Sequence, residues 1–118
     1  MTDHSDGAGG APVDGVLAAL ADPTRRAILD VLAEHGEASA TALAGRLPVS
    51  RQAVVKHLTV LDAAGLVTGE RVGREVRYAV RSAALSATAR WMGALAADWD
   101  RRLAAIKRVA EEAEREDR

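Results

Sequence analysis

A short run of polar residues in the middle of the chain carries side chains that suit the recognition of DNA. The run consists of Ser50, Arg51 and Gln52, followed one turn later by Lys56. An arginine can donate two hydrogen bonds to guanine and a glutamine can pair with adenine, whereas a lysine suits guanine or a phosphate. A serine and the free backbone N–H groups at the start of a helix suit a phosphate. The same residue types also occur on ordinary solvated helix faces, so these four residues leave both interpretations open.

Three arginines that follow at short spacing favour the DNA interpretation. Arg71, Arg74 and Arg77 surround the segment Gly73-Arg74-Glu75, which we expect to be the turn of a β-hairpin. Strand alternation would place Arg71 and Arg77 on one face, with Arg74 at the tip. Such a hairpin can follow the DNA backbone or enter the minor groove, where arginine is favoured. Two glutamates in the same stretch could neutralise part of this charge as surface ion pairs.

The spacing of apolar residues predicts the elements that position these side chains. Val54, Leu58 and Leu61 recur at i, i+4 and i+7, so they form the buried face of a helix that starts after Ser50. Gln52 and Lys56 lie nearly opposite that face. The remaining helices are expected at residues 13–20, 23–35, 39–47 and 85–114, and the hairpin strands at residues 66–72 and 76–81. This order predicts a mainly α fold with a β-hairpin wing, a winged helix-turn-helix.

Local signals mark where the helices begin and end. Asp22, Ser39 and Ser50 are candidate N-caps, and Pro23 suits the first position of a helix because its missing N–H would be unpaired there. Gly65 is expected to end the fourth helix as a left-handed residue. These signals support the helix boundaries that the apolar pattern gives.

Composition restricts the class of protein. The 118 residues suffice for one domain, which we divide into a disordered tail (1–12), a winged helix-turn-helix domain with dimerisation helices at both ends (13–110) and a frayed end (111–118). The absence of cysteine excludes disulfides and thiolate metal ligands and favours a cytoplasmic protein. No apolar run is long enough to span a bilayer, so we expect no membrane partner. The net charge is −1, but residues 43–81 hold seven basic and three acidic side chains, a balance that suits nucleic acid.

The last predicted helix carries a continuous apolar stripe. Its members recur every three or four residues and are Trp91, Leu95, Trp99, Leu103, Ile106 and Ala110. A domain of this size buries only about two-thirds of the surface that its unfolded chain exposes, so a long apolar helix favours a second subunit and hence a homodimer. The two tryptophans could instead line a pocket for a small organic ligand.

The histidines and the absence of catalytic motifs argue against an enzyme. His57 lies at the edge of the apolar face of its helix. We interpret it as a partly buried histidine that forms a hydrogen bond near the boundary with DNA, and a phosphate contact is the alternative. No second histidine is near it in sequence to complete a metal site. A glycine-rich phosphate loop, a nucleophile elbow and an acid–base pair are all missing, so we expect no catalytic activity.

Three segments of the chain resemble the ArsR/SmtB family of winged-helix repressors, in order and at the right spacing. They read LADPTRRAILDVL, VSRQAVVKHLTVLDAAGLV and RVGREVRYAV, and the resemblance extends over residues 13–108. It implies a cytoplasmic homodimer held by the first and last helices, with residues 50–52 and Lys56 on the reading helix and Arg74 at the wing tip. The implied dimer contacts are Val13, Val16, Leu17, Leu20, Trp91, Leu95, Trp99, Leu103 and Ile106.

The chain departs from the metal-sensing members of that family. Those members bind metal through cysteines on an early helix or through Asp, His and Glu on the last helix. This chain has no cysteine and no histidine after His57, and Asp98 and Asp100 are two residues apart, so they do not share a helix face. Its last helix, with the segment WMGALAADWDRRLAAIK, resembles metal-independent members. We therefore expect no metal and no cofactor.

The favoured function is that of a sequence-specific, homodimeric repressor that binds double-stranded DNA at a palindromic operator. The residues expected to contact DNA are Ser50, Arg51, Gln52, Lys56, His57, Arg71, Arg74 and Arg77. One alternative is a winged helix that docks another protein, although apolar residues at the reading positions would suit that function better than Gln52 and Lys56. Another is a regulator that responds to a small organic ligand, whose identity the sequence does not reveal.

Overall fold

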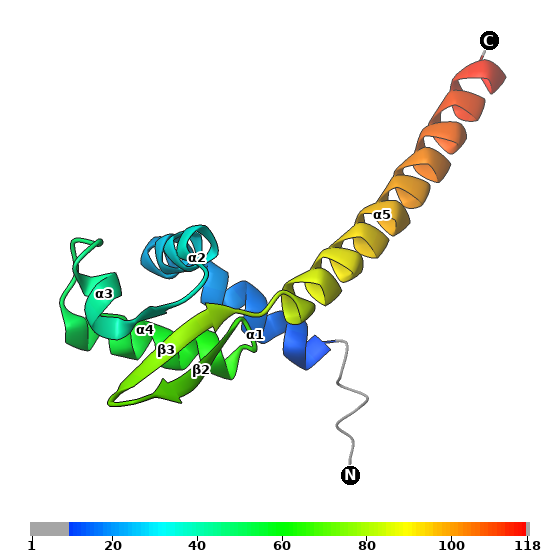
Figure 1. Cartoon of the computed structure of the whole chain (residues 1–118). Helices are drawn as coiled ribbons and strands as arrows, with labels where there is room; N and C mark the ends of the chain where they lie inside the picture. The colour runs from blue at the N-terminus through cyan, green and yellow to red at the C-terminus, as the bar shows by residue number, and fades with distance from the viewer. Residues whose placement is uncertain (1–9, 118) are drawn as a thin grey trace. The chain divides into compact units, whose positions relative to one another are not determined.

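The computed structural model of the chain describes residues 10–117 in two units, one that ends at Thr88 and one that begins at Ala89 (Figure 1). Of the tail predicted for residues 1–12, residues 1–9 lie outside the described residues, and residues 10–12 belong to the first helix. The first unit contains α1 (Gly10–Leu20), α2 (Pro23–His35), β1 (Ala38–Ser39), α3 (Ala40–Ala44), α4 (Arg51–Ala63), β2 (Val67–Val72), β3 (Glu75–Val80) and the start of α5 (Ala83–Glu116). The described part of the second unit consists of the rest of α5.

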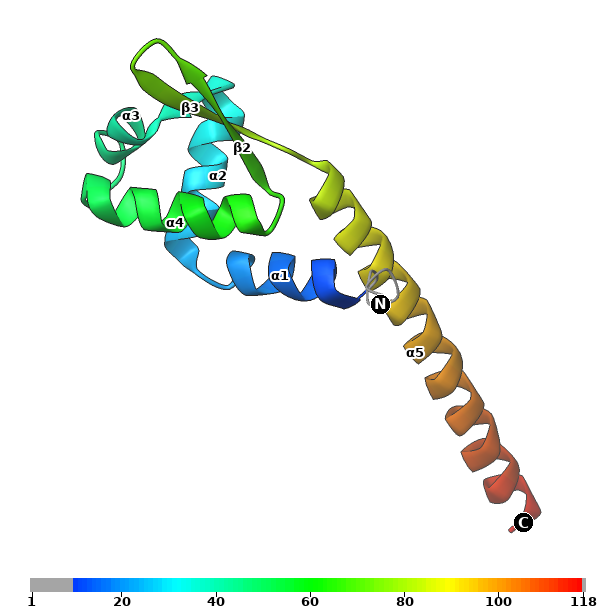
Figure 2. The ribbon, with the colours of Figure 1, turned by 90° about the horizontal axis from the view of Figure 1, so that it is seen from below.

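One apolar core holds the elements of the first unit together. Its largest fully buried side chains come from α1 to β2 and are Val16, Ile28, Leu32, Leu43, Val54, Leu58, Leu61, Leu66 and Val67. The predicted inner face of α4 is thereby confirmed, because Val54, Leu58 and Leu61 are all buried. Helices α1 and α4 lie side by side in this unit (Figure 2).

The predicted helix boundaries are confirmed at most of their caps. The side chains of Asp22, Ser39 and Ser50 each accept a hydrogen bond from a backbone N–H of the following turn, at 2.7, 3.1 and 3.1 Å. Gly65 follows the end of α4 with φ of 78°, a conformation that a side chain would strain. The third helix is shorter than predicted, because it ends at Ala44 instead of Leu47.

The predicted hairpin is confirmed, and the structure adds a third strand to it. Strand β1 pairs with β3 in antiparallel fashion, so the strand order is β1-β3-β2. The sequence did not predict β1, because a strand of two residues is too short to show an alternating pattern. Strands β2 and β3 extend past the helices of the first unit as a wing (Figures 1 and 2).

The register of the wing corrects the expected orientation of its arginines. Val72 pairs with Glu75, so the turn contains only Gly73 and Arg74, whereas a turn of three residues was expected. Arg71 consequently pairs with Val76. Residues opposite each other in an antiparallel pair share a face, and the neighbouring position along the strand lies on the other face. Arg71 and Arg77 therefore lie on opposite faces of the hairpin, because a change of one residue in the turn inverts one strand relative to the other.

Candidate nucleic-acid interface

The start of α4 presents polar side chains to solvent. Ser50 caps the helix, and Arg51, Gln52 and Lys56 are all exposed. The opposite face of the helix is fixed in the core, so the exposed face has one orientation relative to the rest of the first unit. This arrangement suits a reading helix, in which the first turns meet the base edges.

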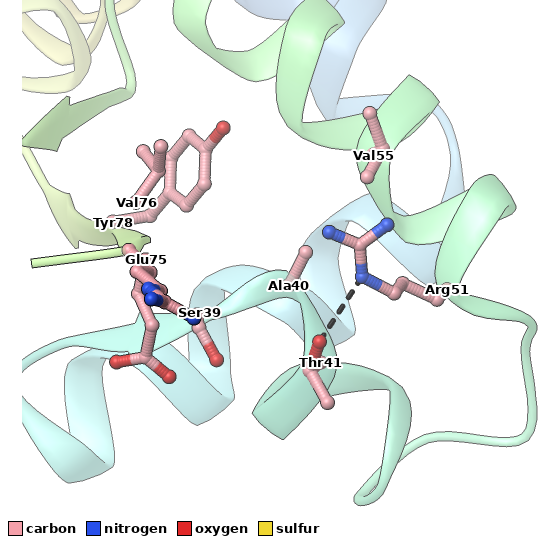
Figure 3. Close-up of a pocket in the computed structure, with 9 residues that line it drawn as sticks. Ser39, Ala40, Thr41, Arg51, Val55, Glu75, Val76 and Tyr78 are labelled. Carbon is pink, nitrogen blue, oxygen red and sulfur yellow. Dashed lines mark hydrogen bonds between the residues drawn. The ribbon is translucent and has the colours of Figure 1, made fainter. Parts of the chain in front are cut away.

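Arg51 is held by the neighbouring helix. Its Nε atom donates a hydrogen bond of 3.0 Å to Thr41 Oγ1 of α3 (Figure 3). The guanidinium lies beside Thr41 and Val55 in the same view. Thr41 was not among the predicted site residues, because its contact with Arg51 depends on how α3 and α4 pack against each other.

The wing carries two arginines without a partner and one that is paired. Arg71 and Arg74 are exposed, and no carboxylate of the described residues lies within 4.0 Å of them. Arg77 lies between Glu37, at 3.2 Å, and Glu75, at 3.4 Å. The hydrogen bond from Arg77 to Glu37, and then the one to Glu75, raise the pKa of Arg77 above its usual value. The charge of Arg77 is thus compensated by carboxylates within the protein.

His57 is half-buried and contacts α2. Its Nδ1 atom lies 3.5 Å from Nη1 of Arg25, and the other nitrogens of Arg25 donate hydrogen bonds to the carbonyl oxygens of Ala18 and Ala19, at 3.1 and 2.7 Å. The contact agrees with the interpretation of His57 as a partly buried, hydrogen-bonded residue. Arg25 was not predicted as its partner, since 32 residues separate the two.

A groove of about 370 Å³ lies between α3, the start of α4 and the wing (Figure 3). The residues that line it are Ser39, Ala40, Thr41, Arg51, Val55, Arg74, Glu75, Val76 and Tyr78. Tyr78 was not predicted as part of the site. Its ring packs over Gly69 on the neighbouring strand, where a Cβ atom would lie 2.9 Å from Cε1 of the ring. A signal for this contact was present in the sequence, as a glycine inside a strand often marks a close approach.

The residues predicted at a dimer interface differ in how accessible they are. Val13 and Val16 are buried within the described chain, and Val16 belongs to the core, so neither offers much surface to a partner. Leu20 is half-buried and Leu17 is 39% exposed. The stripe on α5 is more open, and its exposed fractions rise from 40% at Trp91 to 64% at Ile106; its other large members are Leu95, Trp99 and Leu103.

Two features are absent from the described residues. No helix among the described residues is long and apolar enough to cross a membrane. Over the same part of the chain, no three side chains of His, Cys, Asp or Glu come together in a group that could hold a metal ion.

Comparison with known proteins identifies the family. A model described as a helix-turn-helix domain matches residues 20–70. The transcriptional repressor SdpR of Bacillus subtilis is 31% identical over 80 residues, which cover 68% of this chain and 88% of that protein. A solved ArsR-like transcriptional regulator from Rhodococcus sp. RHA1 is 53% identical, with a TM-score of 0.77 over 85% of this chain and 93% of that chain. The homodimeric winged helix-turn-helix DNA-binding domain Mb0332 from Mycobacterium bovis is 28% identical, with a TM-score of 0.61 over 85% and 89% of the two chains.

These relatives are regulators of transcription and not enzymes, and the two solved structures share the fold of this chain. The chain therefore belongs to the ArsR family of winged helix-turn-helix transcriptional regulators.

Proposed function

We propose that the chain is a homodimeric repressor that binds a palindromic DNA operator and does not respond to a metal ion. The observation that carries the proposal is the set of exposed cations on α4 and the wing. Arg71, Arg74 and Lys56 have no carboxylate partner among the described residues, so their charge is available to phosphates. Neutralised phosphates supply most of the affinity of such proteins for DNA.

The apolar stripe of α5 supports the homodimer. In the described residues from Ala89 onward, this helix has no other element to cover its large side chains, and Trp91, Leu95 and Trp99 are each at least 40% exposed. Exposed apolar surface of this extent is typical of an interface. One similar domain of known structure is homodimeric. Two copies would present two α4 helices to DNA, so we expect a palindrome with half-sites about 10 bp apart.

The residue types support a function without metal. The chain contains no cysteine, and its described part brings together no group of three potential ligands. Repression would then be steric, because an occupied operator excludes other proteins from the promoter. A metal-free function is tested by adding Zn²⁺ or a chelator to the operator complex, and we expect no change in affinity.

Selection from a random pool of double-stranded DNA tests the proposal. Purified protein is used at low and at near-physiological salt, and a palindromic sequence is expected to be enriched at both. Lys56→Ala should weaken binding, and Lys107→Ala is the matched control because Lys107 is exposed on α5, outside the proposed site. Binding at low salt alone without an enriched sequence would contradict the proposal. Equal binding by the two lysine variants would contradict the assignment of the site.

A further inference from the structure

The groove between α3, α4 and the wing has the chemistry of an anion site. Arg51 and Arg74 both line it, and its single carboxylate, that of Glu75, is paired with Arg77 at 3.4 Å. The groove is therefore positively charged overall. Its volume of about 370 Å³ is at the lower end of the range of roughly 300–1,000 Å³ that small-molecule sites occupy. That space suits a compact, charged group.

The orientation of Arg51 is suited to this groove. Because its Nε atom is already bonded to Thr41, the guanidinium lies over α3 (Figure 3). Its two terminal nitrogens make no hydrogen bond with the described residues, so they are free to act as a two-pronged donor. A planar fork of this kind matches the oxygens of a phosphate.

Tyr78 supplies a second donor from the opposite side. Its hydroxyl is directed toward α4 in Figure 3 and has no hydrogen-bond partner within the described part of the chain. The ring packs against Gly69, where there is no side chain to displace it. Half-buried tyrosine hydroxyls usually find a partner, and none is supplied by the protein here. The hydroxyl is thus positioned for an external acceptor.

We infer that this groove binds one phosphate of the DNA backbone, held by Arg51 and Tyr78 with Thr41 as the residue that positions Arg51. The inference rests on the proposed function, since it concerns the same DNA-binding site. A reading helix occupies a major groove and the wing lies at the neighbouring minor groove. The phosphates of one strand separate those two grooves, and they must pass between α4 and the wing. Arg51 then contacts the backbone, and base readout comes from Gln52.

The inference is tested by affinities for two duplexes, the selected operator and a scrambled sequence of the same length. Arg51→Ala should lower affinity about tenfold on both duplexes, and Tyr78→Phe about three- to tenfold on both, so the ratio between the duplexes stays constant. The slope of log affinity against log salt should decrease by about one for Arg51→Ala. Gln52→Ala is the comparison variant, and it should lower affinity for the operator alone. Tyr78→Phe retains the ring, so its folding is not in question.

A neutral methylphosphonate placed at each operator phosphate in turn identifies the contact directly. At one position in each half-site, the substitution should weaken the parent and have little further effect on Arg51→Ala or Tyr78→Phe. Such non-additivity shows that both side chains and the phosphate form one interaction. A loss confined to the operator for Arg51→Ala would overturn the inference in favour of base readout, and parental affinity of Tyr78→Phe would also overturn it. If the parent binds neither duplex, the proposed function itself is wrong.

Discussion

The Nη1 atom of Arg25 lies 3.5 Å from Nδ1 of His57, although α2 and α4 belong to distant parts of the chain. The other two nitrogens of the same guanidinium donate hydrogen bonds to the carbonyl oxygens of Ala18 and Ala19 at the end of α1. Arg25 therefore connects three helices. This connection fixes the start of α2 and the middle of α4 relative to α1.

The contact predicts that His57 acts on stability more than on DNA binding. His57→Lys places a permanent positive charge against Arg25 and should destabilise the protein by about 1–2 kcal/mol. His57→Gln supplies an acceptor without that charge and should cost less than half of that. Urea unfolding at fixed protein concentration measures both values. If His57→Gln instead reduced operator affinity tenfold with unchanged stability, His57 would be a DNA contact.

The lowered pKa of Asp22 predicts that the protein loses stability in acid. The hydrogen bond from the backbone N–H of Arg25 lowers the pKa of Asp22, with a smaller contribution from Thr24 N–H. A carboxyl whose pKa is lower in the folded state stabilises the protein above its unfolded pKa of about 3.9, and that contribution is lost as the pH falls through the folded value. Asp22→Asn should therefore be less stable than the parent near pH 7 and should approach it below about pH 4. Asp30→Asn, at an exposed site on α2, is the control for the loss of one carboxylate.

The two faces of the wing predict different effects of its arginines. Arg71 shares a face with Val76 and Tyr78, which line the groove, whereas Arg77 is paired with carboxylates on the other face. Arg71→Ala should weaken binding to all duplexes and reduce the salt slope by about one. Arg77→Ala should change the slope much less. Equal slopes for the two variants would show that DNA reaches both faces of the hairpin.

The burial of Leu58 predicts how strongly the stability of the protein depends on the core that holds α4. Its side chain is fully buried between α4 and the other helices. Leu58→Ala should destabilise the protein by about 2–5 kcal/mol, since the deletion leaves a cavity. Thermal or urea unfolding measures this, and Thr59→Ala, at an exposed position beside it, should change stability far less.

The stripe on α5 predicts that single charges there prevent dimerisation. Leu95→Asp introduces a carboxylate among large apolar side chains and should yield a monomer by sedimentation at concentrations where the parent is a dimer. Ala94→Asp adds the same charge one residue earlier, on a neighbouring part of the helix surface, and is the matched control. A dimer that survives Leu95→Asp would place the interface elsewhere.

Local rules predicted much of this fold from the sequence. The caps at Asp22 and Ser50 follow from hydrogen bonds to residues two or three positions away, and Gly65 from a backbone conformation that few residues adopt. The buried face of α4 follows from the period of the helix. Each of these features depends only on residues close in sequence.

The rest depends on contacts that local rules do not contain. Turns of two and three residues are both compatible with the sequence around Gly73, yet they give opposite orientations to Arg77. The contact of Arg51 with Thr41 requires the packing of α3 on α4, and that of His57 with Arg25 requires the packing of α2 on α4. Val16 was expected at an interface from the family resemblance, and its side chain is buried in the core of the same chain, which local rules do not reveal.

The two-residue turn at Gly73 and Arg74 also limits how the wing can change through insertions and deletions. If the turn keeps two residues, one added residue would shift the register of β3 by one position and exchange the side chains of its two faces, so that Tyr78 would leave the groove. Two added residues would lengthen the wing and keep every side chain on its face. Descendants of this sequence that retain the two-residue turn and Tyr78 in the groove should therefore differ in wing length by even numbers of residues.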